Sequence, residues 1–121
     1  PFESEQQPVL ATNNLSAMPF YGLARGFLSG KYRPGVKVES VRAEGVAEFY
    51  NDKNWAVLDR VREIAQDHSV PVGAISLAWI RSNPLVSTPI ASARTVEQLE
   101  EIVQIVELTD AELASLNSLS A

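Results

Sequence analysis

The sequence predicts an α/β protein in which short parallel strands alternate with helices. Two apolar runs of strand length, residues 15–21 and 85–91, are each followed along the chain by segments of helical period. This alternation is typical of a parallel sheet with helices packed on it. A parallel sheet needs cover on both faces and neighbours at its edges, so two strands do not form a stable sheet by themselves. We therefore expect this chain to hold only part of a sheet.

The composition is that of one globular domain. Of 121 residues, 45% are hydrophobic and 21% are charged, which argues against general disorder. The absence of cysteine excludes a disulfide framework and thiolate metal sites, and it fits a cytoplasmic location. No apolar run approaches the roughly 18 residues of a membrane span, so no membrane partner is expected. Because the chain starts at Pro1, we expect a processed or partial polypeptide.

The net charge of −5 is unevenly distributed along the chain. Beyond Arg94 every charged residue is acidic, and this pattern predicts a solvated helix face and argues against broad nucleic-acid binding. The loop that follows the first predicted strand instead holds four cations, which are Arg25, Lys31, Arg33 and Lys37.

Helices are predicted from apolar periodicity and capping residues. Asp52 can cap a helix that ends near residue 67, with an apolar stripe formed by Val57, Val61, Ile64 and Ala65. The segment 72–82 is apolar on most sides, so it should be a buried helix. A further helix is expected over 3–13. Another should run from a capping box at Thr95 to about 106, and its apolar stripe would consist of Leu99, Ile102, Val103 and Val106. A last helix should start at a capping box at Thr109 and fray over 115–121.

The stretch from Met18 to Arg33 is the strongest candidate for a functional loop. Gly22, Gly26 and Gly30 recur every four residues, and basic residues follow them. Glycine allows main-chain N–H groups to approach a ligand closely, so this layout can hold a phosphate. By spacing alone an ordinary connecting loop explains it as well, since three glycines and a lysine occur in many surface loops. Residues 27 and 28 are expected in a short helical turn that packs back on the body. The remainder, 34–50, is long for a connector, so it either carries function or is disordered.

Two motifs resemble the aldo-keto reductase family. Residues 19–35, PFYGLARGFLSGKYRPG, are similar to the family's seventh-strand segment, P-Y-Y-S-L-A-x-G-F-L-T-G-K-Y. Residues 88–101, TPIASARTVEQLEE, are similar to P-I-x-G-A-R-x-x-x-Q-L-x-E-N at the eighth strand and the following helix. The resemblance implies that residues 1–121 are the C-terminal, cofactor-binding portion of a (β/α)8 TIM barrel, beginning at the helix before the seventh strand.

The resemblance implies NADPH-dependent reduction of aldehydes or ketones by the intact barrel. Phe20 takes the place of the aromatic that stacks on the nicotinamide, the following loop wraps the pyrophosphate, and Arg94 serves the 2′-phosphate. Arg94 also lies ahead of a capped helix, whose free N–H groups favour an anion. The cofactor-binding residues implied in this way are Phe20, Tyr21, Gly22, Leu23, Arg25, Gly26, Lys31, Arg94, Gln98 and Glu101. Alternatively, Phe20 packs in a core and Arg94 is an ordinary surface arginine.

Two departures from the family pattern affect this site. Ser92 replaces a glycine near the expected phosphate, and Ile102 replaces an asparagine that contacts adenine in the family. The family's catalytic tyrosine, aspartate, lysine and histidine are expected in an earlier part of the barrel, so no catalytic residue is assigned here. His68 follows Asp67 at a predicted helix end, where a capping or solvated role is expected.

A second hypothesis is a truncated, non-catalytic relative that acts as a binding or oligomerisation module. The missing tetrad motivates it, and the surfaces that normally face the rest of a barrel would then be buried by self-association. The expected partners are therefore a nicotinamide cofactor, a carbonyl substrate in the intact protein, and either the remainder of the barrel or a second copy. The sequence identifies neither the substrate nor the oligomeric state.

Overall fold

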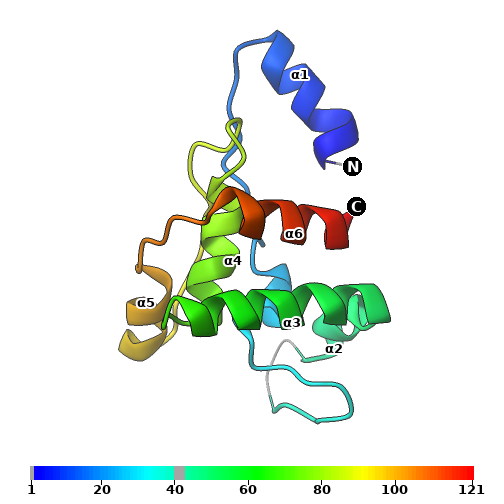
Figure 1. Cartoon of the computed structure of the whole chain (residues 1–121), viewed down its shortest axis with the longest axis vertical. Helices are drawn as coiled ribbons and strands as arrows, with labels where there is room; N and C mark the ends of the chain where they lie inside the picture. Colours follow the sequence, from blue (N-terminus) through cyan, green and yellow to red (C-terminus); the bar gives the residue numbers. More distant parts are fainter. Residues whose placement is uncertain (1, 40–42) are drawn as a thin grey trace.

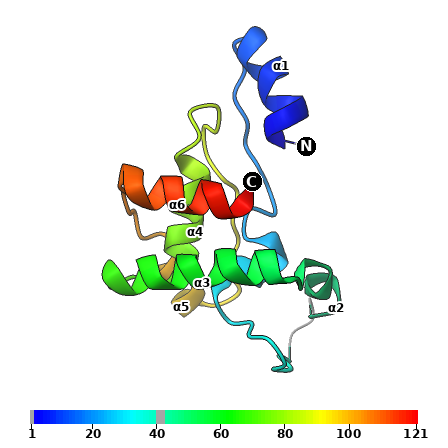
Figure 2. The same cartoon turned by 45° about the vertical axis from the view of Figure 1, so that its right-hand side comes forward.

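The computed structural model describes residues 2–39 and 43–121, and this part of the chain is helical (Figure 1). Three helices form the body: α3 (Asp52–Asp67), α4 (Val72–Arg81) and α6 (Asp110–Ser120). The π-helical turn η1 (Phe2–Gln6) and helix α1 (Gln7–Thr12) project from this body at one end, as two views show (Figures 1 and 2). Among the described residues, no helix combines the length and apolar character that crossing a bilayer requires.

Helix α3 confirms the predicted apolar stripe but begins with a different cap. Its four stripe residues are buried. The side chain of Asn51, one residue before the expected Asp52, accepts a hydrogen bond from the backbone N–H of Asn54 at 2.8 Å. Asn51 has the extended backbone that an N-cap requires, whereas Asp52 is already the first helical residue. The prediction of Asp52 as the cap is therefore wrong by one position.

Helix α4 is buried, as its sequence predicts. Residues 73–78 are all buried, and Ile75 joins residues of α3 and Leu116 of α6 in the main core. The buried polar residue on this helix, Ser76, donates its hydroxyl to the backbone oxygen of Leu28 at 2.8 Å. This bond ties α4 to the glycine-containing loop and satisfies a polar group that would otherwise be costly to bury.

A second core lies beneath the long loop. Its buried residues are Phe27, Tyr32, Val46 and Leu58. Phe27 belongs to the 3₁₀ helix η2 (Ala24–Ser29), which confirms the predicted helical turn at residues 27 and 28. Two short helices that the sequence did not predict, α2 (Ala43–Val46) and η3 (Ala47–Phe49), add apolar contacts to this core. Of the expected irregular segment 34–50, residues 40–42 lie outside the described part.

The two expected strands lie side by side but form only one bridge. Ala17 pairs with Val86 in parallel; the Ala17 N–H donates to Leu85 at 2.7 Å, and the Ser87 N–H donates to Ala17 at 2.9 Å. The described residues contain no longer strand, because Pro19 and Pro89 lack N–H donors and the pair has no neighbouring strand. The apolar composition of residues 85–91 is typical of a buried strand, but this segment is not fully buried, since Ile90 is exposed.

The terminal segments agree with the sequence to different degrees. The N-terminal helical segment is confirmed, with Pro8 in the first turn of α1 and a left-handed Asn14 (φ 53°) after it.

Helix α5 (Val96–Ile102) ends four residues earlier than predicted. Leu99 and the capping residue Val103 are about half exposed, so these two residues of the predicted apolar stripe are not buried. The Thr109 capping box is confirmed, but α6 continues to Ser120 without the predicted fraying.

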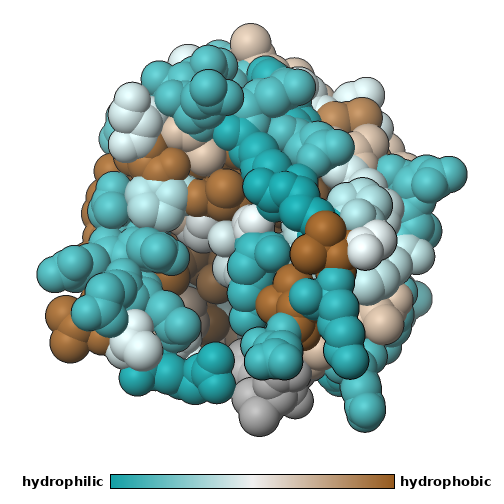
Figure 3. All heavy atoms as spheres, turned by 90° about the horizontal axis from the view of Figure 1, so that it is seen from below, coloured by the Kyte–Doolittle hydropathy of each residue, from teal (hydrophilic) through white to brown (hydrophobic). Residues whose placement is uncertain are grey.

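The face seen from below Figure 1 is mostly hydrophilic (Figure 3). Hydrophobic side chains on this face gather in a recess and in small patches at the rim. Several other apolar side chains are exposed elsewhere, on the paired segments and on the projecting N-terminal helix. The chain therefore combines a compact helical body with apolar surface that its own elements do not cover.

Candidate functional site

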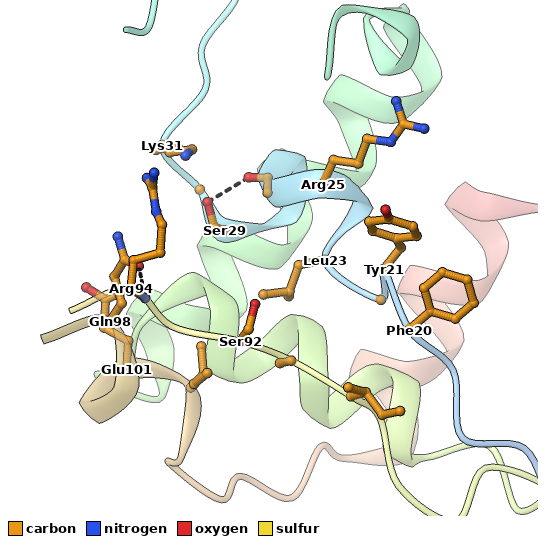
Figure 4. Close-up of a pocket in the computed structure, with 16 residues that line it drawn as sticks. Phe20, Tyr21, Leu23, Arg25, Ser29, Lys31, Ser92, Arg94, Gln98 and Glu101 are labelled. Atoms are coloured by element: carbon orange, nitrogen blue, oxygen red, sulfur yellow. Dashed lines mark hydrogen bonds between the residues drawn. The ribbon is translucent and has the colours of Figure 1, made fainter. Parts of the chain in front are cut away.

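A cavity of about 710 Å³ lies between the glycine-containing loop and the segment from Ile90 to Ile102 (Figure 4). This volume falls within the roughly 300–1,000 Å³ range of small-molecule and cofactor sites. All ten residues that the sequence analysis assigned to the cofactor line this one cavity. The structure thus brings together two segments that are about 70 positions apart in the sequence.

The loop that forms one wall has an unusual backbone. Tyr21, Ala24 and Arg25 have φ of 59°, 48° and 56°, which is a left-handed conformation that non-glycine residues rarely adopt. Local hydrogen bonds hold it, among them Ala24 N–H to Tyr21 (2.8 Å) and the Ser29 hydroxyl to Gly26 (2.6 Å). Backbone conformations of this kind cluster at ligand sites, where the surrounding structure compensates for their cost.

The three cations of the cavity have different surroundings. Arg25 pairs with Glu48 at 3.2 Å and donates to the backbone oxygen of Gly45 at 3.5 Å, so its charge is directed toward the short helices beyond the loop. The side chains of Arg94 and Lys31 lie at one end of the cavity in the view of Figure 4. Within the described residues, the guanidinium of Arg94 makes no hydrogen bond or ion pair to another side chain. The positive end of the cavity is therefore formed by Lys31 and Arg94.

Two aromatic residues form another part of the cavity, away from Lys31 and Arg94 in Figure 4, and Arg25 lies over the ring of Tyr21 at 5.8 Å from its centre. The rings of Phe20 and Tyr21 have centroids 4.8 Å apart and are 69% and 60% exposed as residues. Exposed aromatic faces can stack on a planar ligand. Phe20 is consequently not a core residue in this chain, and the alternative prediction of core packing is wrong.

Helix α5 forms the other wall. The Thr95 hydroxyl accepts from the N–H of Gln98 at 3.3 Å, while the Gln98 side chain accepts from the N–H of Arg94 at 3.0 Å. These two bonds fix the backbone of Arg94 against the first turn of the helix. The N–H of Gln98, one of the groups expected to be free at this helix start, is thereby occupied by Thr95. The preference for an anion therefore rests on side-chain charge.

Six further residues line the cavity. Ser92 and Ile102, the two departures from the family pattern, are among them. The other four were not predicted, although they stand inside or between the matching motifs and that position was a usable signal. They are Ser29, Gly30, Ile90 and Ala91.

His68 lies outside this cavity. Its Nε2 is 2.8 Å from Oε1 of Glu112, and this contact joins the end of α3 to the first turn of α6. Burial raises the pKa of the Glu112 carboxyl, but hydrogen bonds from Thr109 and His68 together bring it below its ordinary value. This contact could not be predicted from the sequence, because 44 positions separate the two residues.

Other candidate sites are weaker. A second cavity of about 420 Å³, between η1, α4 and α6, is mostly apolar, and none of the described residues lining it is lysine or arginine. No group of three histidine, aspartate or glutamate side chains in the described part of the chain is placed to hold a metal ion. The larger cavity is thus the one suited to a negatively charged ligand.

Comparison with known proteins places the chain in a family. The sequence model of the Aldo/keto reductase family matches residues 2–121. The chain therefore belongs to the aldo/keto reductase family. The L-glyceraldehyde 3-phosphate reductase of Escherichia coli O157:H7 is 29% identical over 102 residues, which cover 78% of this chain and 30% of that protein. An aldo-keto reductase of Fusarium vanettenii is 30% identical over 98% of this chain and 34% of that protein.

A solved structure gives the fold. The glycerol dehydrogenase of Gluconobacter oxydans, a TIM barrel, matches with a TM-score of 0.75 and 21% identity, over 98% of this chain and 38% of that one. Its barrel supports the prediction that this helix-rich chain is part of a (β/α)8 barrel. The chain spans about a third of the length of the curated relatives that it matches.

Proposed function

We propose that this chain is the cofactor-binding part of a cytoplasmic, NADP-dependent oxidoreductase that reduces aldehydes or ketones. One observation carries the proposal: ten residues from two distant segments line a single cavity that is cationic at one end and aromatic at another. A dinucleotide with a 2′-phosphate and a planar nicotinamide has the same distribution of charge and aromatic surface. Family membership supports the choice of a nicotinamide cofactor over other anionic ligands.

Each wall has a separate role in this proposal. Phe20 stacks on the nicotinamide, and the loop from Tyr21 to Lys31 lies along the pyrophosphate with its backbone N–H groups. Arg94 binds the 2′-phosphate through its planar fork, which matches phosphate oxygens in bidentate fashion. Gln98 and Glu101 contact the adenosine end. Ser92 adds a hydroxyl donor close to the phosphate, while Ile102 offers apolar surface where the family has an amide.

The bound nicotinamide would supply a hydride to a carbonyl carbon. This chain's residues bind and orient the cofactor, and none of them is proposed as the acid that protonates the carbonyl oxygen. That acid would come from another part of the protein. The named relatives include reductases of L-glyceraldehyde 3-phosphate and of versiconal hemiacetal acetate, so we propose a substrate class, aldehydes and ketones, and no particular member.

The test compares NADPH and NADH affinities for Arg94→Ala in the complete protein. A charged hydrogen bond contributes about 1.5–3 kcal/mol, so the dissociation constant for NADPH should rise roughly 10- to 150-fold. The dissociation constant for NADH should change little, because NADH lacks the 2′-phosphate. Fluorescence quenching of Trp55 and Trp79 gives a direct titration signal.

Two further variants complete the test. Arg94→Lys keeps the charge but loses the fork, so NADPH affinity should fall to an intermediate value. Lys37→Ala removes a cation that does not line the cavity and should leave both affinities unchanged. An Arg94→Ala protein that binds NADPH as tightly as the unaltered protein would refute the phosphate assignment.

The alternative function, a non-catalytic binding or oligomerisation module, is favoured by the apolar side chains that the chain leaves exposed, including Leu15 and Met18. In that case the cavity would bind no nicotinamide, and the apolar surface would be covered by another copy. The absence of NADPH binding by the folded protein, together with stable self-association, would support this alternative over the reductase.

A further inference from the structure

Arg62 lies outside the cavity but contacts the loop that forms its wall. It projects from α3, and its side chain is only 16% exposed. Asp59, one turn earlier on the same helix, holds the guanidinium through an ion pair of 2.7 Å between Oδ1 and Nη1. The other terminal nitrogen, Nη2, is thereby directed toward the loop.

The carbonyl groups that Arg62 binds flank Lys31. Nη2 donates to the backbone oxygen of Gly30 at 3.3 Å and also to the backbone oxygen of Tyr32. Arg33 donates to the same two oxygens from Nη1, at 2.7 Å and 3.1 Å. Two guanidinium groups therefore hold the carbonyl groups on both sides of Lys31, and each carbonyl oxygen has two lone pairs with which to accept them.

Two other elements restrain the same stretch of chain. Tyr32 is fully buried in the second core, and the ammonium of Lys31 lies 5.2 Å from the centre of its ring. Gly30 packs directly against Val72 at the start of α4. The backbone around Lys31 is thus held by α3 through Arg62, by α4 through Val72, and by the core through Tyr32. Both Lys31 and Arg94 line the cavity, and Figure 4 draws their side chains at the same end of it.

The position of Arg62 also carries an unfavourable feature. Its Nε is buried and has no hydrogen-bond partner among the described residues. An unsatisfied buried donor lowers stability, so an apolar side chain would suit the site better if packing were all that mattered. Among the described residues, the hydrogen bonds and ion pair of the Arg62 guanidinium go to Asp59 and to the two carbonyl groups beside Lys31.

We propose that Arg62 is a positioning residue that fixes the backbone of Lys31, so that its ammonium keeps its place in the cavity, and that this raises the affinity of the site for the phosphates of the cofactor. This inference rests on the proposed cofactor site, but its geometric part does not require a cofactor. Arg62 would act through the backbone of residues 30–32, without touching the ligand.

The geometric part can be tested by limited trypsin digestion without any cofactor. Trypsin cleaves after Lys31, whereas the bond after Arg33 resists because Pro34 follows it. Arg62→Met should speed cleavage of the Lys31–Tyr32 bond at least about tenfold, since opening of this loop would no longer break two charged hydrogen bonds. Arg60→Met is the matched control: Arg60 lies on the same helix but contacts Glu63 and Ser115, both at 2.9 Å, so the rate should not change.

The functional part is tested by a double-mutant cycle with NADPH. Arg62→Met should weaken NADPH binding about three- to tenfold in the unaltered background and have no further effect when Lys31→Ala is present. Arg62→Lys should not restore affinity, because it keeps the charge but lacks the planar fork that binds Asp59 through one nitrogen and the carbonyl groups through the other. If Arg62→Met does not fold, Asp59→Asn takes its place, since it releases the guanidinium while altering an exposed side chain.

Several results would overturn the inference. Equal cleavage rates for Arg62→Met and Arg60→Met would show that Arg62 does not hold the loop. An equal loss of NADPH affinity with and without Lys31, or full rescue by Arg62→Lys, would show that Arg62 acts through general stability or charge. If the unaltered protein binds no NADPH, the proposed function fails, and the cleavage rates alone decide whether Arg62 positions the loop.

Discussion

Gly30 illustrates how a single residue fixes the wall of the cavity. Its φ of 87° is in the left-handed region, and a Cβ atom placed on it would lie 2.8 Å from Cβ of Val72. Both the backbone conformation and the close packing against α4 therefore require glycine. Gly35 has a similar φ of 70°, but nothing lies within 4 Å of its would-be Cβ.

This pair of glycines gives a matched prediction. Gly35→Ala should lower the free energy of unfolding by about 1 kcal/mol, from the left-handed backbone alone. Gly30→Ala should lower it by about 2–4 kcal/mol, because overpacking against Val72 adds to the same conformational cost. Urea denaturation of both variants measures the difference. Equal losses would mean that the contact with Val72 relaxes freely.

At the scale of residues, the sequence predicts which side chains line the same cavity but not which ion pairs they form. All ten candidate residues line one cavity because the two motifs carry their loop geometry with them. The pairing of Arg25 with Glu48 was not predictable, since it depends on short helices, α2 and η3, that have no clear period in the sequence. The cap of α3 was missed by one position because Asn51 and Asp52 both suit an N-cap.

At the scale of elements, α6 is attached to the body at both of its ends. In the first turn Glu112 accepts a hydrogen bond from the backbone N–H of Thr109 at 2.8 Å and contacts His68 of α3. In the last turns Asn117 accepts from the indole N–H of Trp79 at 2.8 Å, and Leu116 is buried between them. The carboxylate of Glu112 thus links capping of one helix to packing against another.

The stability supplied by Glu112 should depend on pH. Although burial raises its pKa, the bonds from Thr109 and His68 lower it below the ordinary value of 4.5 in the folded state. The unfolded chain therefore takes up a proton first, so the stabilisation is complete above that value and is lost as pH falls through the lower folded pKa.

Glu112→Gln should consequently flatten this part of the pH profile. Between about pH 6 and about pH 3.5, the unaltered chain should lose more unfolding free energy than the variant does. Glu107→Gln, which changes an exposed carboxyl just before α6, should follow the unaltered chain. Parallel profiles for the unaltered chain and Glu112→Gln would exclude this role for the carboxylate.

The sequence predicted best those helices whose apolar residues recur with the helical period and pack against other residues of this chain. Helices α3 and α4 have stripes or faces whose partners lie within the chain. The stripe of α5 and the apolar run 85–91 have the same signal, but the described residues cover them only in part. Periodicity shows which side chains share one apolar face. Whether that face is buried depends on other segments, which lie far away in the sequence.

At the scale of the whole molecule, part of the exposed apolar surface lies where the two paired segments lack neighbours. Leu15 and Met18 are more than half exposed beside the single parallel bridge. Backbone N–H and C=O groups at such an edge can pair with another chain. The fold as it stands therefore favours association along this edge.

We predict that the 121-residue chain associates reversibly and that lysine at this edge opposes it. Leu15→Lys combined with Met18→Lys should raise the dissociation constant at least about tenfold, because charged side chains disfavour pairing at sheet edges. Ile105→Lys alters an equally exposed apolar residue elsewhere and should have little effect. Sedimentation velocity over a range of concentrations measures both. A chain that stays monomeric throughout would contradict the prediction.

The poor burial of α5 has a consequence for binding thermodynamics. Helix α5 has only seven residues, and Leu99 and the capping Val103 are about half exposed, so we expect local opening of this helix to cost little free energy. A ligand held by Arg94, Gln98 and Glu101 would order α5 as it binds, and part of the interaction free energy would be spent as lost conformational entropy. Affinity at this cavity is therefore set jointly by contacts and by local folding, so a substitution that stabilises α5 tightens binding without touching the ligand.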